Sequence, residues 1–242
     1  MPRIVVLGAG TGVGKTWVTE ALARALGGRV GFSAVLALKP VESGIPPGSM
    51  RVGLGAPAGS DAAALEIACE RSGRILPHPR YGFPDPVSPH LAARRANETI
   101  EISVITAWVR HQEQAALSPE GQLWCLVETA GGAFSPLSNE STNADLALAL
   151  KPDRVLLVGA DRLGVLHDLG ATVIALSNRG LTVDHIILSE AAPRDASTGA
   201  NARELHELRA TLRLGETRIW SVPRDQSEQV GALAECLHAD SG

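Results

Sequence analysis

Short, almost uninterrupted apolar runs recur along the chain and alternate with segments of helical spacing. A strand with one face in water alternates apolar and polar side chains, whereas a strand covered on both faces is apolar throughout. The pattern therefore predicts an α/β fold of the doubly wound kind, in which helices flank both faces of a mostly parallel sheet. The predicted strands cover residues 3–8, 33–40, 123–128, 154–159, 185–190 and 217–222.

The predicted helices cover residues 15–28, 99–117, 164–179, 200–213 and 226–238. Two stretches interrupt this alternation. Residues 44–60 are rich in Gly and Pro, which predicts a mobile surface loop. Residues 77–90 are so dense in Pro that we expect no regular element there. The length of 242 residues is within the range of one large domain, so we expect a single domain over residues 1–242.

Composition and charge argue against several classes of protein. The net charge is −4 and there is no long basic run, which disfavours binding to nucleic acid or to an anionic membrane. No apolar run approaches the ~20 residues that span a bilayer, and the N-terminal residues lack the pattern of a secretion signal. Cys69, Cys125 and Cys236 are far apart, form no metal-binding spacing and suit a reducing compartment. We expect a cytoplasmic protein, with Cys125 in its core.

Residues 8–16 read GAGTGVGKT and join the first predicted strand to the first predicted helix. Glycines at alternate positions let backbone N–H groups approach phosphate oxygens, Lys15 can reach the β- and γ-phosphates, and the Thr16 hydroxyl is placed to bind Mg²⁺. The ordinary phosphate loop has four residues between its first Gly and Gly-Lys-Thr, a place that Ala9 occupies here. Gly8 fits only with five residues between. The stretch therefore predicts a nucleotide-binding loop of unusual spacing.

Charged side chains stand at the start or the end of three further predicted elements. Lys39 ends the second strand, Asp61 stands at a helix start, and Glu128 ends an apolar strand. The carboxyl ends of parallel strands meet at one edge of the sheet, so Lys39 is expected to face the same crevice as Lys15. Glu128 is expected to serve a metal, a water or a phosphate partner. Taken alone, Lys39 also fits a solvated lysine, and Asp61 fits a helix cap unless Ser60 fills that role.

Five motifs, in order, resemble those of the dethiobiotin synthetases, ATP-dependent ligases of biotin synthesis. They are the phosphate loop with its five-residue spacing, K-P-V-x-S-G at 39–44, S-D-A-x-x-L at 60–65, P-x-S-P-H at 86–90, and V-E-x-A-G-G at 127–132 with a following Pro-Leu. Each motif alone is weak, whereas five in order are specific. The resemblance covers the chain from its N-terminus to about residue 190, and more thinly beyond.

The resemblance implies a reaction. One amine of 7,8-diaminononanoate is carbamylated by CO₂ derived from bicarbonate, ATP phosphorylates the carbamate, and the second amine closes a cyclic urea. The products are dethiobiotin, ADP and phosphate. ATP and Mg²⁺ are the implied cofactors. The family also implies a homodimer with its active sites at the interface between the two copies.

The resemblance also implies roles for individual residues. Those that act on the reacting groups are Lys15, Lys39, Thr11 and Ser43, and the Mg²⁺ ligands are Thr16, Asp61 and Glu128. The substrate is held by Lys39 and Ser43, and its carboxylate tail by a helix start of the second copy that corresponds to Gly164, Val165, Leu166 and His167. The nucleotide is bound by Gly12, Val13, Gly14, Lys15, Thr16, Trp17, Asp61, Glu128, Thr129, Ala130, Gly131, Ser189, Glu190, Pro223, Arg224 and Asp225.

The chain departs from the family pattern at a few positions. Gly12 stands where the family usually has an acid, and Thr129 stands in place of a glycine. The pair that recognises the base, usually Asn-Asp, is Ser189-Glu190 here, and Ser offers fewer donors than Asn. The alternatives are a related amide-forming ligase, a substrate-shifted or inactive ATP-binding homologue, and an ATP-gated partitioning or metal-delivery switch. The switches carry an extra lysine early in the loop, where Gly10 stands here.

Overall fold

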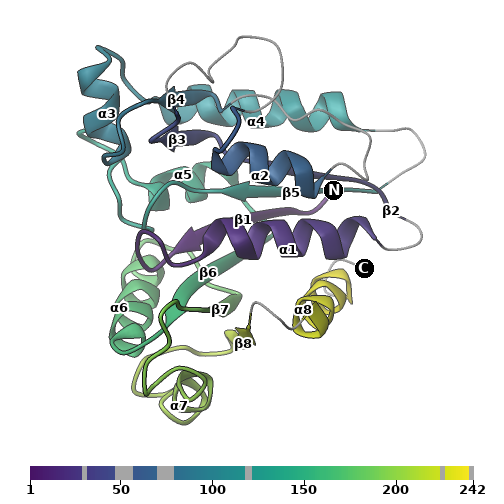
Figure 1. The fold of residues 1–242 in the computed structure, drawn as a ribbon, viewed down its shortest axis with the longest axis vertical. Coiled ribbons are helices and arrows are strands. Elements are labelled where there is room, and N and C mark those ends of the chain that lie inside the picture. Colours follow the sequence, from purple (N-terminus) through teal and green to yellow (C-terminus); the bar gives the residue numbers. More distant parts are fainter. Residues whose placement is uncertain (29–31, 47–56, 70–78, 118–121, 224–226, 240–242) are drawn as a thin grey trace.

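The computed structural model describes the chain except for residues 29–31, 47–56, 70–78, 118–121, 224–226 and 240–242. A six-stranded sheet of order β2-β5-β1-β6-β7-β8 forms its centre, and every neighbouring pair in it is parallel (Figure 1). The predicted strands are confirmed. They are β1 (Arg3–Gly8), β2 (Phe32–Leu38), β5 (Gln122–Glu128), β6 (Arg154–Asp161), β7 (His185–Glu190) and β8 (Arg218–Val222).

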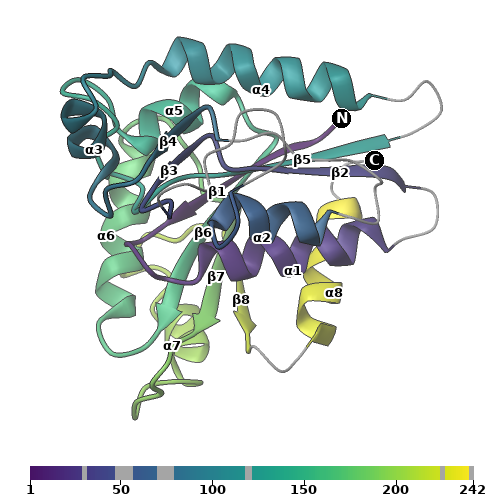
Figure 2. The same ribbon diagram turned by 45° about the horizontal axis from the view of Figure 1, so that its top comes forward.

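Helices cover both faces of the sheet, as the continuous apolar strands predicted (Figures 1 and 2). The connection from β1 to β2 crosses one face of the sheet, and the connections that lead toward β8 cross the other face. Right-handed crossovers produce this arrangement. One face carries α1 (Lys15–Gly27), α2 (Asp61–Ala68) and α8 (Ser227–Ala239). The other carries α4 (Ile102–Ala116), α5 (Asn143–Leu150), α6 (Val165–Ser177) and α7 (Asn201–Glu207).

A second, two-stranded parallel sheet lies beside the carboxyl end of β2. It pairs β3 (Val41–Ser43) with β4 (Tyr81–Phe83), and α3 (Pro89–Arg95) packs against both strands. The expectation of no regular element in residues 77–90 is therefore wrong. The prolines flank β4 rather than interrupt it, and Pro89 stands in the first turn of α3, where a missing N–H group has no helical partner to lose.

Other differences concern lengths and short elements. The helix predicted over 200–213 ends at Glu207, and the chain continues in turns to Arg213, which has a positive φ of 54°. The sequence pattern predicted neither α3 nor α5. Most of the predicted loop at 44–60 lies outside the described residues.

The core lies between the sheet and its two helical layers. Ile4, Val5, Val6 and Leu7 of β1 are each 0% exposed, because helices cover both faces of this central strand. Cys125 is also fully buried, in agreement with the prediction. Among the described residues, no helix is both long enough and apolar enough to cross a bilayer.

Candidate active site

The glycine-rich loop curls between the end of β1 and the start of α1. Gly14 caps α1 with φ at +88°, and a β-carbon there would stand 2.2 Å from the Ser189 hydroxyl oxygen, so only glycine fits. The Lys15 side chain folds back over the loop, is 6% exposed, and has its ammonium 3.4 Å from the Gly10 carbonyl oxygen. The loop thus places a buried lysine inside a turn rich in backbone N–H groups, which is an arrangement suited to phosphate.

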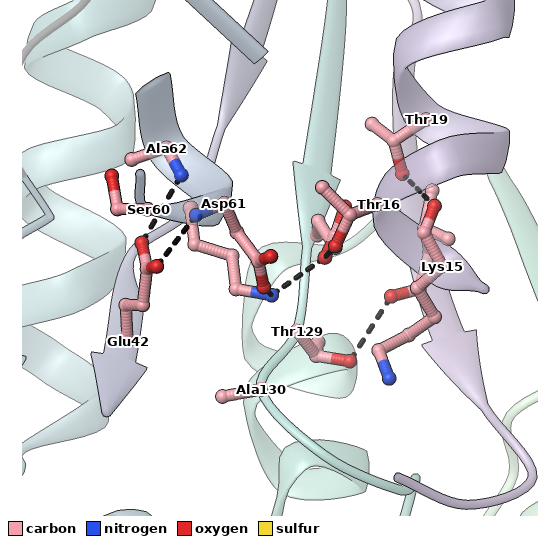
Figure 3. A network of polar contacts seen from close by, with 12 residues as sticks. Lys15, Thr16, Thr19, Glu42, Ser60, Asp61, Ala62, Thr129 and Ala130 are labelled. Atoms are coloured by element: carbon pink, nitrogen blue, oxygen red, sulfur yellow. Dashed lines mark hydrogen bonds and ion pairs between the residues drawn. The ribbon is translucent and has the colours of Figure 1, made fainter. Parts of the chain in front are cut away.

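Four elements bring a lysine, two carboxylates and a hydroxyl together next to this loop. Lys39 follows β2, and its ammonium lies 2.5 Å from Glu128 Oε1 at the end of β5 and 2.8 Å from Asp61 Oδ2 at the start of α2. The Thr16 hydroxyl, in the first turn of α1, donates to the same Glu128 oxygen at 2.8 Å. Figure 3 shows Thr16 and Asp61 pointing toward each other from their two helices. Lys39 is therefore a buried, paired ammonium rather than a solvated one.

The two lysines have opposite electrostatic surroundings. Burial lowers the pKa of Lys15 to about 8, and the positive charge of Lys39 adds to this effect. Burial also lowers the pKa of Lys39, but Glu128 and Asp61 outweigh it and raise that pKa above its ordinary value. Burial raises the pKa of Asp61, whereas its ion pair with Lys39 outweighs burial and holds the pKa below its usual range. Lys39 and Asp61 are therefore both charged at neutral pH.

The oxygen atoms around Glu128 suit the binding of a magnesium ion. Hydroxyl and carboxylate oxygens are the ligands that Mg²⁺ prefers, and Glu128 Oε2 is buried without a hydrogen-bond partner among the described residues. Within that part of the chain, no three His, Cys, Asp or Glu side chains are grouped to hold a metal by themselves. Such a site leaves most of the shell to phosphate oxygens and water, as is usual for Mg²⁺.

The start of α2 settles whether Asp61 caps its own helix. Ser60 is the N-cap, since its hydroxyl accepts from the Ala63 N–H at 3.1 Å. The carboxylate of Glu42, in β3, accepts from the N–H groups of Asp61 at 2.6 Å and Ala62 at 3.1 Å (Figure 3). Our sequence interpretation assigned no role to Glu42. The Asp61 side chain is left to pair with Lys39.

The segment after Glu128 packs against the phosphate loop. The Thr129 hydroxyl donates to the Val6 carbonyl oxygen at 3.0 Å and is buried, so it is turned into the protein rather than toward the crevice. Gly131 has a φ of +79°, and a β-carbon there would lie 3.4 Å from the Thr11 hydroxyl oxygen. Thr11 and this turn are therefore neighbours.

Asn143 holds the same segment in place from the start of α5. Its side-chain amide donates to the carbonyl oxygens of Ala130 at 2.6 Å and Gly132 at 2.9 Å, and the residue is fully buried. The sequence interpretation missed Asn143 together with α5. An Asn directly after Thr142, in a Thr-Asn-Ala-Asp start with a capping box, is the signal that was available.

Ser43 ends β3 in the small sheet. Its hydroxyl donates to the Val87 carbonyl oxygen at 2.7 Å, which ties β3 to the P-x-S-P-H segment. Within that segment the Ser88 hydroxyl and His90 Nδ1 lie 3.1 Å apart. The hydroxyl proton of Ser43 is engaged in this bond, so its oxygen remains available as an acceptor.

A pocket of about 520 Å³ opens on the other side of the phosphate loop, toward β6 and β7. Glu190 lines it and pairs with Arg194 at 3.4 Å. Ser189 lies beneath the loop, 1% exposed and against Gly14. Arg224 and Asp225 lie outside the described residues, and Pro223, directly after β8, does not line this pocket. The lining residues are Thr11, Gly12, Val13, Gly14, Ala160, Arg162, Glu190, Ala191, Ala192, Pro193, Arg194 and Asp195.

The turn at 164–167 starts α6 at the same edge of the sheet. Gly164 precedes the helix with φ at +95° and is exposed, whereas Val165 is buried. Leu166 is half-buried and His167 is exposed. The strands β5 and β1 separate β6, which leads into this turn, from β2 and Lys39. The turn and the Lys39 cluster thus occupy different parts of the edge within one chain.

Comparisons with known proteins agree with this geometry. The family described as "AAA domain" matches residues 2–223. The ATP-dependent dethiobiotin synthetase BioD of Caulobacter sp. (strain K31) is 35% identical over 243 residues, 99% of this chain and 95% of that protein. The enzyme of the same name from Anaeromyxobacter sp. (strain Fw109-5) is 37% identical over 198 residues, 81% of this chain and 79% of that protein.

Among solved structures, similar chains include the MinC:MinD cell division protein complex of Aquifex aeolicus, with a TM-score of 0.55 at 12% identity over 99% of this chain and 96% of that one. Another is the hydrogenase maturation factor HypB of Archaeoglobus fulgidus, with a TM-score of 0.52 at 12% identity over 99% and 89%. At this identity the likeness concerns the fold alone. With near full-length relatives above 30% identity, the chain belongs to the family of ATP-dependent dethiobiotin synthetases.

Proposed function

We propose that the chain converts 7,8-diaminononanoate, CO₂ and ATP to dethiobiotin, ADP and phosphate where β1, β2 and β5 end. The observation that carries this proposal is the buried Lys39 ammonium, held by Asp61 and Glu128 beside the phosphate loop. Each intermediate of the reaction is an anion, first a carbamate and then its mixed anhydride with phosphate. A fixed ammonium in a site of low dielectric stabilises such charge as it develops.

The groups around Lys39 suit each bond change. The first amine attacks CO₂ and releases a proton to solvent, which gives a carbamate whose charge the Lys39 ammonium would help to stabilise. Ser43 would accept from an amine N–H, because its own proton is donated to the Val87 carbonyl oxygen. Thr11, on the exposed part of the loop, would donate to a carbamate oxygen. The carbamate oxygen then takes the γ-phosphoryl group of ATP, and ADP leaves. The second amine attacks the carbonyl carbon, phosphate leaves, and the amine proton passes to solvent.

The phosphate loop is proposed to hold the triphosphate. Lys15 is the one basic side chain inside it, and a bound polyanion would raise its pKa from about 8 and keep it charged. Thr16, Asp61 and Glu128 would hold Mg²⁺, which when bound neutralises phosphate charge during transfer. The adenine and ribose are proposed to lie in the pocket lined by Glu190, toward the residues after β8. Ser189 is buried beneath the loop and does not line this pocket.

We further propose a cytoplasmic homodimer. The free cysteines Cys69, Cys125 and Cys236 suit a reducing compartment. The α6 start is exposed, with Leu163 before it 80% exposed, so it is accessible to a second copy. The Val165 N–H donates to the Arg162 carbonyl oxygen at 3.1 Å, so the other N–H groups of this start would bind the carboxylate tail of a substrate held by that copy. Sedimentation showing only monomer at micromolar concentration would reject the shared site.

The test is product formation. Wild-type protein with Mg-ATP, bicarbonate and 7,8-diaminononanoate is expected to yield dethiobiotin, ADP and phosphate in equal amounts, measured by mass spectrometry and a phosphate assay. ATP consumption that proceeds only with another amine substrate would favour a related amide-forming ligase. ATP binding without turnover at high enzyme concentration would identify an inactive homologue.

A further inference from the structure

Glu42 is a buried carboxylate that the proposed reaction does not use. It lies in the middle of β3, is 6% exposed, and is paired through its backbone register with Gly82 of β4. Among the described residues, no lysine or arginine forms an ion pair with it. Its two oxygens instead accept from two backbone N–H groups at the start of α2.

These two bonds complete the start of α2. Glu42 Oε1 takes the N–H of Asp61 and Oε2 takes that of Ala62, while the Ser60 hydroxyl takes that of Ala63. The N–H of Ala64 already bonds within the helix, to the Ser60 carbonyl oxygen. All free donors of the first turn therefore have partners from outside the Asp61 side chain.

This leaves the Asp61 carboxylate free to leave its own helix. The positive end of a helix attracts a carboxylate in its first turn, and free N–H groups there would offer it donors. Here the Glu42 carboxylate occupies those groups. Asp61 Oδ2 instead reaches Lys39 at 2.8 Å, next to the pair that Lys39 forms with Glu128.

We propose that Glu42 is a positioning residue that holds the start of α2 so that Asp61 faces Lys39 and the magnesium site. The proposal rests on the proposed role of Asp61 toward Mg²⁺. Without the Glu42 carboxylate, the first two N–H groups of α2 become free and Asp61 turns back onto them. The Mg²⁺ concentration needed for nucleotide binding then rises, in addition to any loss of stability.

The test compares Glu42→Gln and Glu42→Ala with Ser60→Ala, which removes the other side-chain cap of the same helix. The readout is the Mg²⁺ concentration that gives half-maximal binding of a fluorescent ATP analogue, with melting temperature measured alongside. Loss of an outer-shell partner typically weakens metal binding 10–100-fold, so we expect Glu42→Ala to raise this concentration by about tenfold and Glu42→Gln by less. Ser60→Ala is expected to lower the melting temperature and leave the Mg²⁺ requirement at the wild-type value.

The inference is overturned if the Glu42 variants only melt earlier, or if Ser60→Ala shifts the Mg²⁺ requirement equally. Asp61→Asn separates it from the proposed function. If Asp61→Asn raises the Mg²⁺ requirement and Glu42→Gln does not, the role of Glu42 alone fails. If Asp61→Asn has no effect, the magnesium role of Asp61 fails and the inference with it. In support, Glu42→Gln is expected to add little when combined with Asp61→Asn.

Discussion

Two halves of the same sheet edge use their acidic side chains in different ways. In the half where β2 and β5 end, Asp61 and Glu128 both pair with the ammonium of Lys39, at 2.8 and 2.5 Å. The three charged side chains of this cluster come from three separate parts of the chain. Such a buried cluster is sensitive to substitution, since removing one charged group leaves its partners buried and uncompensated.

In the half where β6 and β7 end, Glu190 pairs with Arg194 at 3.4 Å, whereas Asp161 and Asp195 bond to loop segments. Asp161, 4% exposed, accepts from the Gly199 N–H at 2.8 Å and from the Asn201 side-chain amide at 2.7 Å. Asp195 accepts from the Leu163 N–H at 2.8 Å. Acids near the strand ends of the two halves are therefore not equivalent. In one half the acids pair with a buried ammonium, and in the other Asp161 and Asp195 hold loop segments in place.

The largest effect is expected from Lys39→Ala. Removing a preorganised group that stabilises developing negative charge typically costs about 10²–10³-fold in turnover. Nucleotide affinity should change far less, because Lys39 is proposed to face the carbamate rather than the triphosphate. Steady-state kinetics and equilibrium nucleotide binding of the same preparation measure both.

A matched control is Arg95→Ala, which removes an ion pair with Asp85 whose two side chains are 54% and 42% exposed. That variant is expected to keep wild-type turnover, because exposed pairs contribute little. Wild-type turnover in Lys39→Ala would show that Lys39 has no role in the reaction. It would also contradict the proposed functional difference between the two halves of the sheet edge.

A smaller effect of another kind is expected from Asp161→Ala. It removes the acceptor of the Gly199 N–H and one acceptor of the Asn201 amide, which also donates to the Ser197 carbonyl oxygen at 3.1 Å. The free energy of unfolding should therefore fall by about 2 kcal/mol. Turnover at saturating substrate should stay close to that of the wild type. Denaturant unfolding measures the change in free energy, and steady-state kinetics measures the turnover. A turnover loss as large as that of Lys39→Ala would contradict the prediction.

A comparable effect, on stability alone, is a pH dependence set by Lys15. Its pKa is about 8 in the folded protein, against 10.5 for the ordinary side chain, so between these values the unfolded chain binds more protons. Stability should therefore rise with pH in that window, by roughly 1 kcal/mol per pH unit, and the effect is absent above it because Lys15 is neutral in both states. The measurement is the difference in unfolding free energy between wild type and Lys15→Met, without nucleotide or metal. A difference that is flat from pH 8 to 10 would show that Lys15 is not held in a desolvated site.

The sheet was predictable because its strands are buried on both faces. Runs such as 4–7 have no polar side chain to confuse with a surface pattern, and the structure buries each of these residues completely. The phosphate loop was recognisable because strand, glycines, Lys15 and helix coincide in one short stretch. Local sequence carries both signals.

The contacts that complete the site were not predictable in this way. Glu42 and Asn143 act through backbone groups of segments that are distant in sequence, Asp61 and Ala130 among them. A pattern along the chain does not encode which N–H or carbonyl a side chain meets in three dimensions. The short β4 was missed because the prolines around it dominate the local signal, although none lies within the strand.

The most direct test of the account compares the two halves in one assay. Dethiobiotin formation is measured for wild type, Lys39→Ala and Asp161→Ala at saturating Mg-ATP, bicarbonate and 7,8-diaminononanoate, with all three shown to be folded. The account predicts product from wild type and Asp161→Ala at similar rates, and a rate at least about 100-fold lower from Lys39→Ala. Equal rates from the two variants, or no dethiobiotin from the wild type, would contradict it.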